Sequence, residues 1–96
     1  MKVVYTPAAL RDLSEIADWL VTHYPTIAPL VERRIRAAVD QISRWPESAR
    51  RSAARRGVRV ALVGRYPYKI FYRMADETIE ILHVHHTSRR PWDEQE

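Results

Sequence analysis

Prolines divide the first half of the chain into two helical segments, and this division most limits the possible folds. Thr6 and Pro7 form a strong helix start, with a hydroxyl at the N-cap and proline at the first helical position. The helix should end near Tyr24, because Pro25 cannot continue it. Its apolar residues recur at helical spacing: Leu10, Leu13, Ile16, Ala17 and Leu20.

A second helix follows after a very short connection. Thr26 can cap it, Pro29 is acceptable in its first turn, and Pro46 stops it. Its apolar stripe consists of Val31, Ile35, Ala38, Ile42 and Trp45. Two helices joined so closely should pack antiparallel as a hairpin.

The second half of the chain predicts strands. Residues 57–63, 65–74 and 78–86 alternate or favour β-structure, and residues 2–5 form a short first strand. Residues 47–56 are polar, rich in arginine and without apolar period, which predicts a loop. The expected fold is therefore α+β with the order β-α-α-β-β-β. An antiparallel helical hairpin packs on one face of a mainly antiparallel four-stranded sheet. Residues 1–96 should form a single domain with a polar tail at about 90–96.

The segment 65–74 (RYPYKIFYRM) mixes cations with aromatic residues, and strand alternation assigns them to faces. If Val58, Val60 and Leu62 face the helices, the opposite face becomes cationic and partly apolar, as a partner-binding surface often is. The residues then expected towards the helices also include Ile70, Tyr72, Leu82 and Val84. Those expected on the opposite face are Arg59, Lys69, Arg73, His83 and His85, with Phe71, Ile79 and Ile81.

Composition narrows the class of protein. The chain has no cysteine, which excludes disulfides and a thiol nucleophile and suits a cytoplasmic location. No apolar run approaches the roughly 20 residues that span a membrane, so we expect no membrane partner. The net charge is +4 and most cations are arginines, whose planar fork suits phosphate and carboxylate. They cluster at Arg50, Arg51, Arg55, Arg56 and Arg59, and again at Arg89 and Arg90.

The whole chain, to about Trp92, resembles the RelE/ParE superfamily of bacterial toxins from type II toxin–antitoxin systems. Residues 7–16 match the first-helix pattern A-x-x-D-L-x-x-I, and Pro46 follows the second helix. Gly57-Val58-Arg59 opens the central sheet. Residues 68–73 and 79–86, the latter followed by Arg89, complete the resemblance. The order and spacing of these pieces, rather than any one of them, carry the resemblance.

The resemblance implies a growth-inhibiting toxin that is neutralised by the C-terminal segment of a cognate antitoxin. ParE-like members of the superfamily poison DNA gyrase, whereas RelE-like members cleave mRNA on the ribosome. The first-helix pattern and the strand at 68–73 favour the ParE-like branch. The RelE-like branch stays open as the alternative, and so does an inactive relic that only binds antitoxin.

The resemblance also suggests site residues. In the ribonuclease branch, Arg59, Lys69, His85 and Arg89 would be catalytic, and His85 or His86 would replace a C-terminal tyrosine as acid or base. This set is partial, because Ala61 stands at a second basic position and the C-terminal tyrosine of many nucleases is missing. The residues expected to bind antitoxin or target are Arg50, Arg51, Arg55, Arg56, Arg59, Lys69, Arg73, Arg89 and Trp92.

The histidines near the end of the chain raise the question of a metal site. His83 and His85 share a strand face, and His86 follows them. A zinc site needs three or four ligands, and the sequence contains no cysteine and no carboxylate at an evident spacing from them. The sequence therefore predicts no metal and no cofactor.

Overall fold

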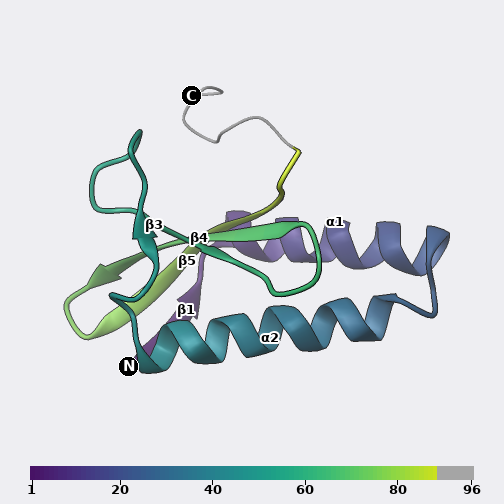
Figure 1. The fold of residues 1–96 in the computed structure, drawn as a ribbon, viewed down its shortest axis with the longest axis horizontal. Helices are drawn as coiled ribbons and strands as arrows, with labels where there is room; N and C mark the ends of the chain where they lie inside the picture. The colour runs from purple at the N-terminus through teal and green to yellow at the C-terminus, as the bar shows by residue number, and fades with distance from the viewer. Residues whose placement is uncertain (89–96) are drawn as a thin grey trace.

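A computed structural model of the chain describes residues 1–88, so the predicted tail at 90–96 lies outside the described residues (Figure 1). The strands are β1 (Lys2–Tyr5), β2 (Arg50–Arg51), β3 (Arg59–Leu62), β4 (Tyr68–Ala75) and β5 (Thr78–His86). The helices are α1 (Pro7–His23) and α2 (Ala28–Arg44), which run antiparallel as a hairpin (Figure 1). Neither helix is long and apolar enough to cross a membrane.

The two helices begin in different ways. The predicted cap of α1 is confirmed, because the Thr6 hydroxyl oxygen accepts a hydrogen bond from the backbone N–H of Ala9 at 3.1 Å. The predicted cap of α2 is wrong: its N-cap is Ile27, which makes no side-chain capping bond, and not Thr26. The N–H groups of Ile27 and Ala28 bond to the carbonyl of Tyr24, so the turn that ends α1 also contains Thr26.

The α+β class is confirmed, but the sheet has five strands in the order β1-β5-β4-β3-β2. β1 lies parallel to β5, and the other neighbours are antiparallel. The fifth strand is β2, which falls inside the predicted loop at 47–56 and pairs with β3. Gly57 has φ +78°, a conformation that glycine adopts without strain, and it helps return the chain to β3. This return lets the Ser52 N–H reach the Val58 carbonyl at 2.7 Å.

Both helices cover the same face of the sheet, hereafter the helix face. The main core lies between the helices and this face. Its buried members from the helices are Ala9, Leu20, Val31, Ile35, Val39 and Ile42. Those from the sheet and its connections are Val63, Tyr68, Ile70, Tyr72, Ile79, Ile81 and Val84. The predictions for Ile70, Tyr72 and Val84 are confirmed, whereas Ile79 and Ile81 were wrongly expected on the opposite face.

A bulge in β5 explains why simple alternation fails there. Phe71 pairs with His83 while the next residue, Tyr72, pairs with Ile81, so Leu82 has no partner in the register. One extra residue changes the phase of a strand. Ile79 and Ile81 therefore share the helix face with Val84, and Leu82 packs on the opposite, far face.

The far face carries a second and smaller apolar cluster, formed by Val58, Val60 and Phe71 with Leu82 against them. Val58, Val60 and Leu62 were expected to face the helices, and this is wrong. Pairing fixes the correct phase: Val60 lies opposite Phe71, and Ala61 lies opposite Ile70. Ala61 therefore faces the helices and Leu62, which is 67% exposed, faces away.

Candidate functional site

The arginine-rich segment between α2 and β3 lies at one edge of the sheet, where β2 is the last strand. Arg50, Arg51 and Arg56 are exposed, and Arg55 is half-buried. The backbone around them is held by the Ser52 hydroxyl, whose oxygen accepts from the N–H of Arg55 at 3.1 Å. The segment therefore presents several guanidinium groups from an ordered turn, an arrangement that suits carboxylates or phosphates.

Arg59 does not lie with the other predicted cations of the sheet. It pairs with Tyr72 in the register and thus faces the helices. Its Nη1 donates to the carbonyl oxygens of Glu47 at 3.1 Å and Ala49 at 2.7 Å. The expectation that Arg59, Lys69 and Arg73 emerge together is wrong, because the phase of β3 is opposite to the one predicted.

Tyr72 strengthens the same attachment. Its hydroxyl donates to the carbonyl oxygen of Pro46 at 2.6 Å, beside the two bonds of Arg59. Burial raises the pKa of the Tyr72 phenol above its ordinary value, while the positive charge of Arg59 acts in the opposite direction. Arg59 and Tyr72 together tie the segment after α2 to the sheet.

Lys69 and Arg73 project from the far face, as predicted. The ammonium of Lys69 lies 5.5 Å from the ring centre of Phe71, and Lys69 pairs with His85 in the register. Arg73 donates from Nε to Glu80 Oε1 at 2.6 Å, and its side chain is 54% exposed. The far face therefore combines cations with an apolar cluster. Glu80, the partner of Arg73, offsets part of the positive charge of this face.

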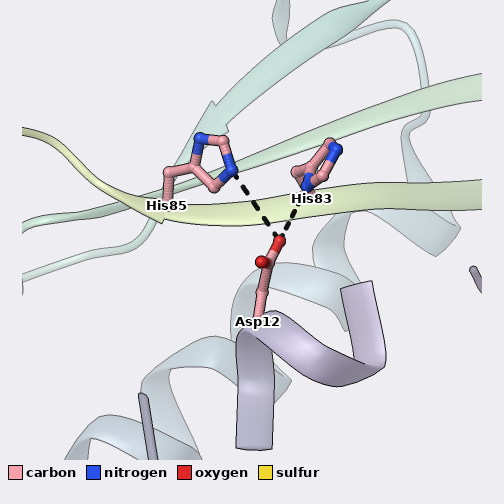
Figure 2. A group of neighbouring side chains, drawn as sticks. All are labelled: Asp12, His83 and His85. Carbon is pink, nitrogen blue, oxygen red and sulfur yellow. Dashed lines mark hydrogen bonds and ion pairs between the residues drawn. The ribbon is translucent and has the colours of Figure 1, made fainter. Parts of the chain in front are cut away.

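Three ligating side chains converge where α1 meets β5 (Figure 2). Asp12 Oδ2 lies 2.9 Å from His83 Nδ1 and 3.8 Å from His85 Nε2. The backbone N–H of Val84 donates to the same oxygen at 3.0 Å. β1 pairs with β5 only as far as Ile81, and Asp12 of α1 occupies the edge of β5 beyond that point.

Sequence reasoning missed Asp12, although a signal for it exists. Asp12 lies three residues after Ala9 and four before Ile16, so it belongs to the stripe of α1 that faces the core. A carboxylate in such a stripe is almost always paired when buried. The identity of its partners could not be read, because they lie 71 and 72 residues further along the chain.

The hairpin itself forms a groove of about 510 Å³ between its two helices. Apolar side chains from both helices line it, including Ile16, Leu20, Val31 and Ile35. Val21, also in the lining, is 62% exposed. Such an apolar groove on an exposed hairpin is suited to an amphipathic segment of another chain.

Two predicted site residues, Arg89 and Trp92, lie outside the described residues. Among the residues that the structure describes, the predicted nuclease set is divided. Lys69 and His85 share the far face, and Arg59 faces the helices. Tyr68, in which burial also raises the phenol pKa, belongs to the main core.

The class of protein follows from these features and from solved structures that share them. The fold matches that of a chain from a "Chromosomal ParDE TA system from P. aeruginosa", with a TM-score of 0.72 and 26% identity, covering 90% of this chain and 95% of that one. It also matches a chain of the toxin–antitoxin complex RelBE2 from Mycobacterium tuberculosis, with a TM-score of 0.59 and 30% identity, covering 88% and 95%. The architecture is thus that of toxin–antitoxin proteins.

The family is shown by sequence. Residues 3–91 match the family described as the ParE toxin of the type II toxin–antitoxin system, parDE. The toxin RelE2 of Caulobacter vibrioides is 33% identical over 88 residues, which cover 92% of this chain and 97% of the relative. The putative toxin Y4kP of Sinorhizobium fredii is 33% identical over 89 residues, covering 93% and 91%. The chain belongs to the ParE toxin family of type II toxin–antitoxin systems.

Proposed function

We propose that the chain stops growth as a ParE-like poison of DNA gyrase and that a cognate antitoxin neutralises it. The family match supports the ParE-like branch. The resemblance described above implies that members of this branch act on gyrase. Among solved structures, the ParDE chain gives a TM-score of 0.72 and the RelBE2 chain 0.59. In this branch the toxin acts by binding a protein and needs no nuclease site.

The contacts of Arg59 carry the proposal. A ribonuclease of the RelE-like kind needs cations and a proton donor around one phosphate, so that they stabilise the charge of the transition state. Arg59 already donates to two backbone carbonyls on the helix face, while Lys69 and His85 lie on the far face. Side chains on opposite faces of a sheet point away from each other, which disfavours a shared phosphate. Arg59 is therefore better suited to holding the fold than to cleaving RNA.

The antitoxin would use two surfaces described above. The apolar groove between the helices suits the apolar side of an amphipathic segment. Arg50, Arg51 and Arg56 at the edge of the sheet suit acidic residues in the same partner. Since β2 is an edge strand, an extended part of the antitoxin could also pair with its free side.

A gyrase supercoiling assay with purified toxin tests the proposal. We expect inhibition with accumulation of cleaved DNA complexes, and reversal by the purified antitoxin. Replacing Arg51 by glutamate should weaken the reversal by antitoxin, because Arg51 lies on the proposed antitoxin surface. The matched control Arg33→Glu makes the same charge change on the exposed side of α2 and should leave the reversal intact. Full gyrase activity at toxin concentrations that arrest growth would overturn the proposal.

A ribosome-dependent ribonuclease is the second candidate. It is favoured by Lys69 and His85, which pair across β4 and β5 on one face, and by the relative named RelE2. Primer extension on translated mRNA should then show cuts in the ribosomal A site that disappear in Lys69→Ala and in Arg89→Ala. Intact message during growth arrest would exclude this candidate.

A further inference from the structure

We propose that Asp12, His83 and His85 form a binding site for a divalent transition metal, with zinc as the best fit. All three offer a ligand atom, and these atoms lie within 4.8 Å of one another (Figure 2). Neither proposed function, gyrase poison or ribonuclease, requires the three residues to act together. The sequence predicted no metal because it showed no carboxylate near the histidines, but the fold brings one from α1.

The positions of the three residues on α1 and β5 already bring their side chains together. His83 and His85 are two residues apart on β5, so their rings leave the strand on the same side, with centroids 4.8 Å apart. Asp12 reaches them past the edge of β5, where its Oδ2 accepts the Val84 N–H at 3.0 Å. A hydrogen bond of this kind orients a carboxylate, which is the role of outer-shell contacts around metal ligands.

Two of the three distances between ligand atoms are close to those that zinc requires, and the third, between the histidine nitrogens, is within 4.8 Å. Around a tetrahedral zinc with bonds of about 2.0–2.1 Å, neighbouring ligand atoms stand roughly 3.4 Å apart. Asp12 Oδ2 lies 2.9 Å from the His83 nitrogen and 3.8 Å from the His85 nitrogen, which brackets this value. Because the His83 side chain is 21% exposed, it has room for the small rotation that would complete the site. Metal binding would displace a proton from the contact between His83 and Asp12.

The donor set selects the metal. Two imidazole nitrogens and one carboxylate oxygen suit zinc and similar transition ions, whereas calcium and magnesium prefer oxygen ligands throughout. Asp12 and Val84 also line a pocket of about 310 Å³, which gives solvent a route to the carboxylate. The fourth ligand would be water, and the bound ion would join α1 directly to β5.

Calorimetric titration of the full chain with zinc chloride tests the site. We expect one zinc ion per chain with a dissociation constant in the micromolar range or below, and a rise in melting temperature that a chelator reverses. The side-chain nitrogen signals of His83 and His85 should shift in NMR spectra, while those of His23 should not. His83→Gln, which alters a partly exposed ligand, should weaken binding by at least about tenfold.

Two control variants separate this site from ordinary surface histidines. His86→Gln changes the next residue, which contacts Tyr68 and Ser88, and His23→Gln changes the end of α1. Both should bind zinc as the parent does. No binding, or binding that survives in His83→Gln, would overturn the proposal and leave the three residues as an internal hydrogen-bond network. Circular dichroism of each variant checks that its folding is unchanged.

Discussion

Two groups of polar contacts join the sheet to the elements that pack on it, and they differ in chemistry. At one, Arg59 and Tyr72 hold the segment after α2 through the carbonyls of Pro46, Glu47 and Ala49. At the other, Asp12 of α1 holds β5 through the Val84 N–H and the two histidine rings. The first group spans 10 to 26 residues in sequence and includes an exposed bond to Glu47, whereas the hydrogen bonds of Asp12 span 71 and 72 residues and are buried or partly buried.

The difference separates a cation used for folding from groups still able to bind a ligand. The partners of Arg59 are backbone carbonyls, which do not titrate, so its guanidinium contributes to holding the fold. The partners of Asp12 include two imidazoles, and each of the three side chains carries an atom of a kind that ligates metal ions. Arg59, which sequence reasoning assigned to a functional surface, thus makes structural contacts, whereas Asp12, which it overlooked, lies among possible metal ligands.

Loss of the Asp12 carboxylate should have the largest effect. Asp12→Ala leaves the Val84 N–H without its acceptor and removes the 2.9 Å contact with His83, and we expect a loss of about 3 kcal/mol in the free energy of unfolding. Asp12→Asn keeps an oxygen for the Val84 N–H and should lose only about 1 kcal/mol. Urea denaturation measures both. Equal losses in the two variants would mean that charge, and not the hydrogen bond to β5, is what matters.

Loss of the Arg59 guanidinium should come next. Arg59→Met keeps the aliphatic stem but removes the donors to Glu47 and Ala49, which should cost about 2 kcal/mol. Toxicity per folded molecule should remain, because in this account Arg59 does not contact the target. The measurement is urea denaturation combined with growth arrest at matched levels of soluble protein. If Arg59→Met is stable but no longer toxic, Arg59 acts in toxicity. The contacts of Arg59 and those of Asp12 would then not differ in the way described above.

The Tyr72 hydroxyl should contribute less. Tyr72→Phe removes one hydrogen bond, to Pro46, and should lose about 1 kcal/mol at neutral pH. Its pH dependence follows from the raised pKa of the buried phenol. Above the ordinary value of 10.0 the unfolded phenol ionises while the folded one stays protonated, so stability falls as pH rises. Denaturation series on both sides of that pH should show a shallower fall in Tyr72→Phe than in the parent.

The ion pair on the far face should matter least. Arg73 and Glu80 are cross-strand neighbours, but the Arg73 side chain is 54% exposed, and exposed pairs contribute less than about 1 kcal/mol. A double-mutant cycle with Arg73→Met and Glu80→Gln should give a coupling energy of about 0.5 kcal/mol that shrinks in high salt. A coupling as large as the effect of Arg59→Met would show that the far face is also held by charge.

These two groups also show what the sequence could reveal. Local signals identified both helices: Thr6 and Pro7 at the start of α1, and Pro25 and Pro46 after the ends. The α+β class followed from them together with the alternating segments. The far-face positions of Lys69 and Arg73 were also correct, because alternation within β4 alone decides them.

What failed depends on register between strands, which local patterns do not contain. In β3 every second residue is apolar on one side, but Ala61 and Val63 on the other side pack against the helices. In β5 the bulge at Leu82 shifts the alternation by one residue. The helix-face positions are therefore Ile79 and Ile81 before the bulge and Val84 after it. The site residue Asp12 meets its partners only through the packing of α1 beside β5, and its role could not be predicted before that packing was known.

The proposed function requires that the toxin act on gyrase without cutting RNA. The direct measurement is to induce the chain in cells and follow, over the first minutes, a DNA-damage reporter together with primer extension on an abundant message. We predict that the reporter rises, that the message stays intact, and that co-expressed antitoxin prevents the response. Messages cut at ribosomal A sites, with a silent reporter, would contradict it.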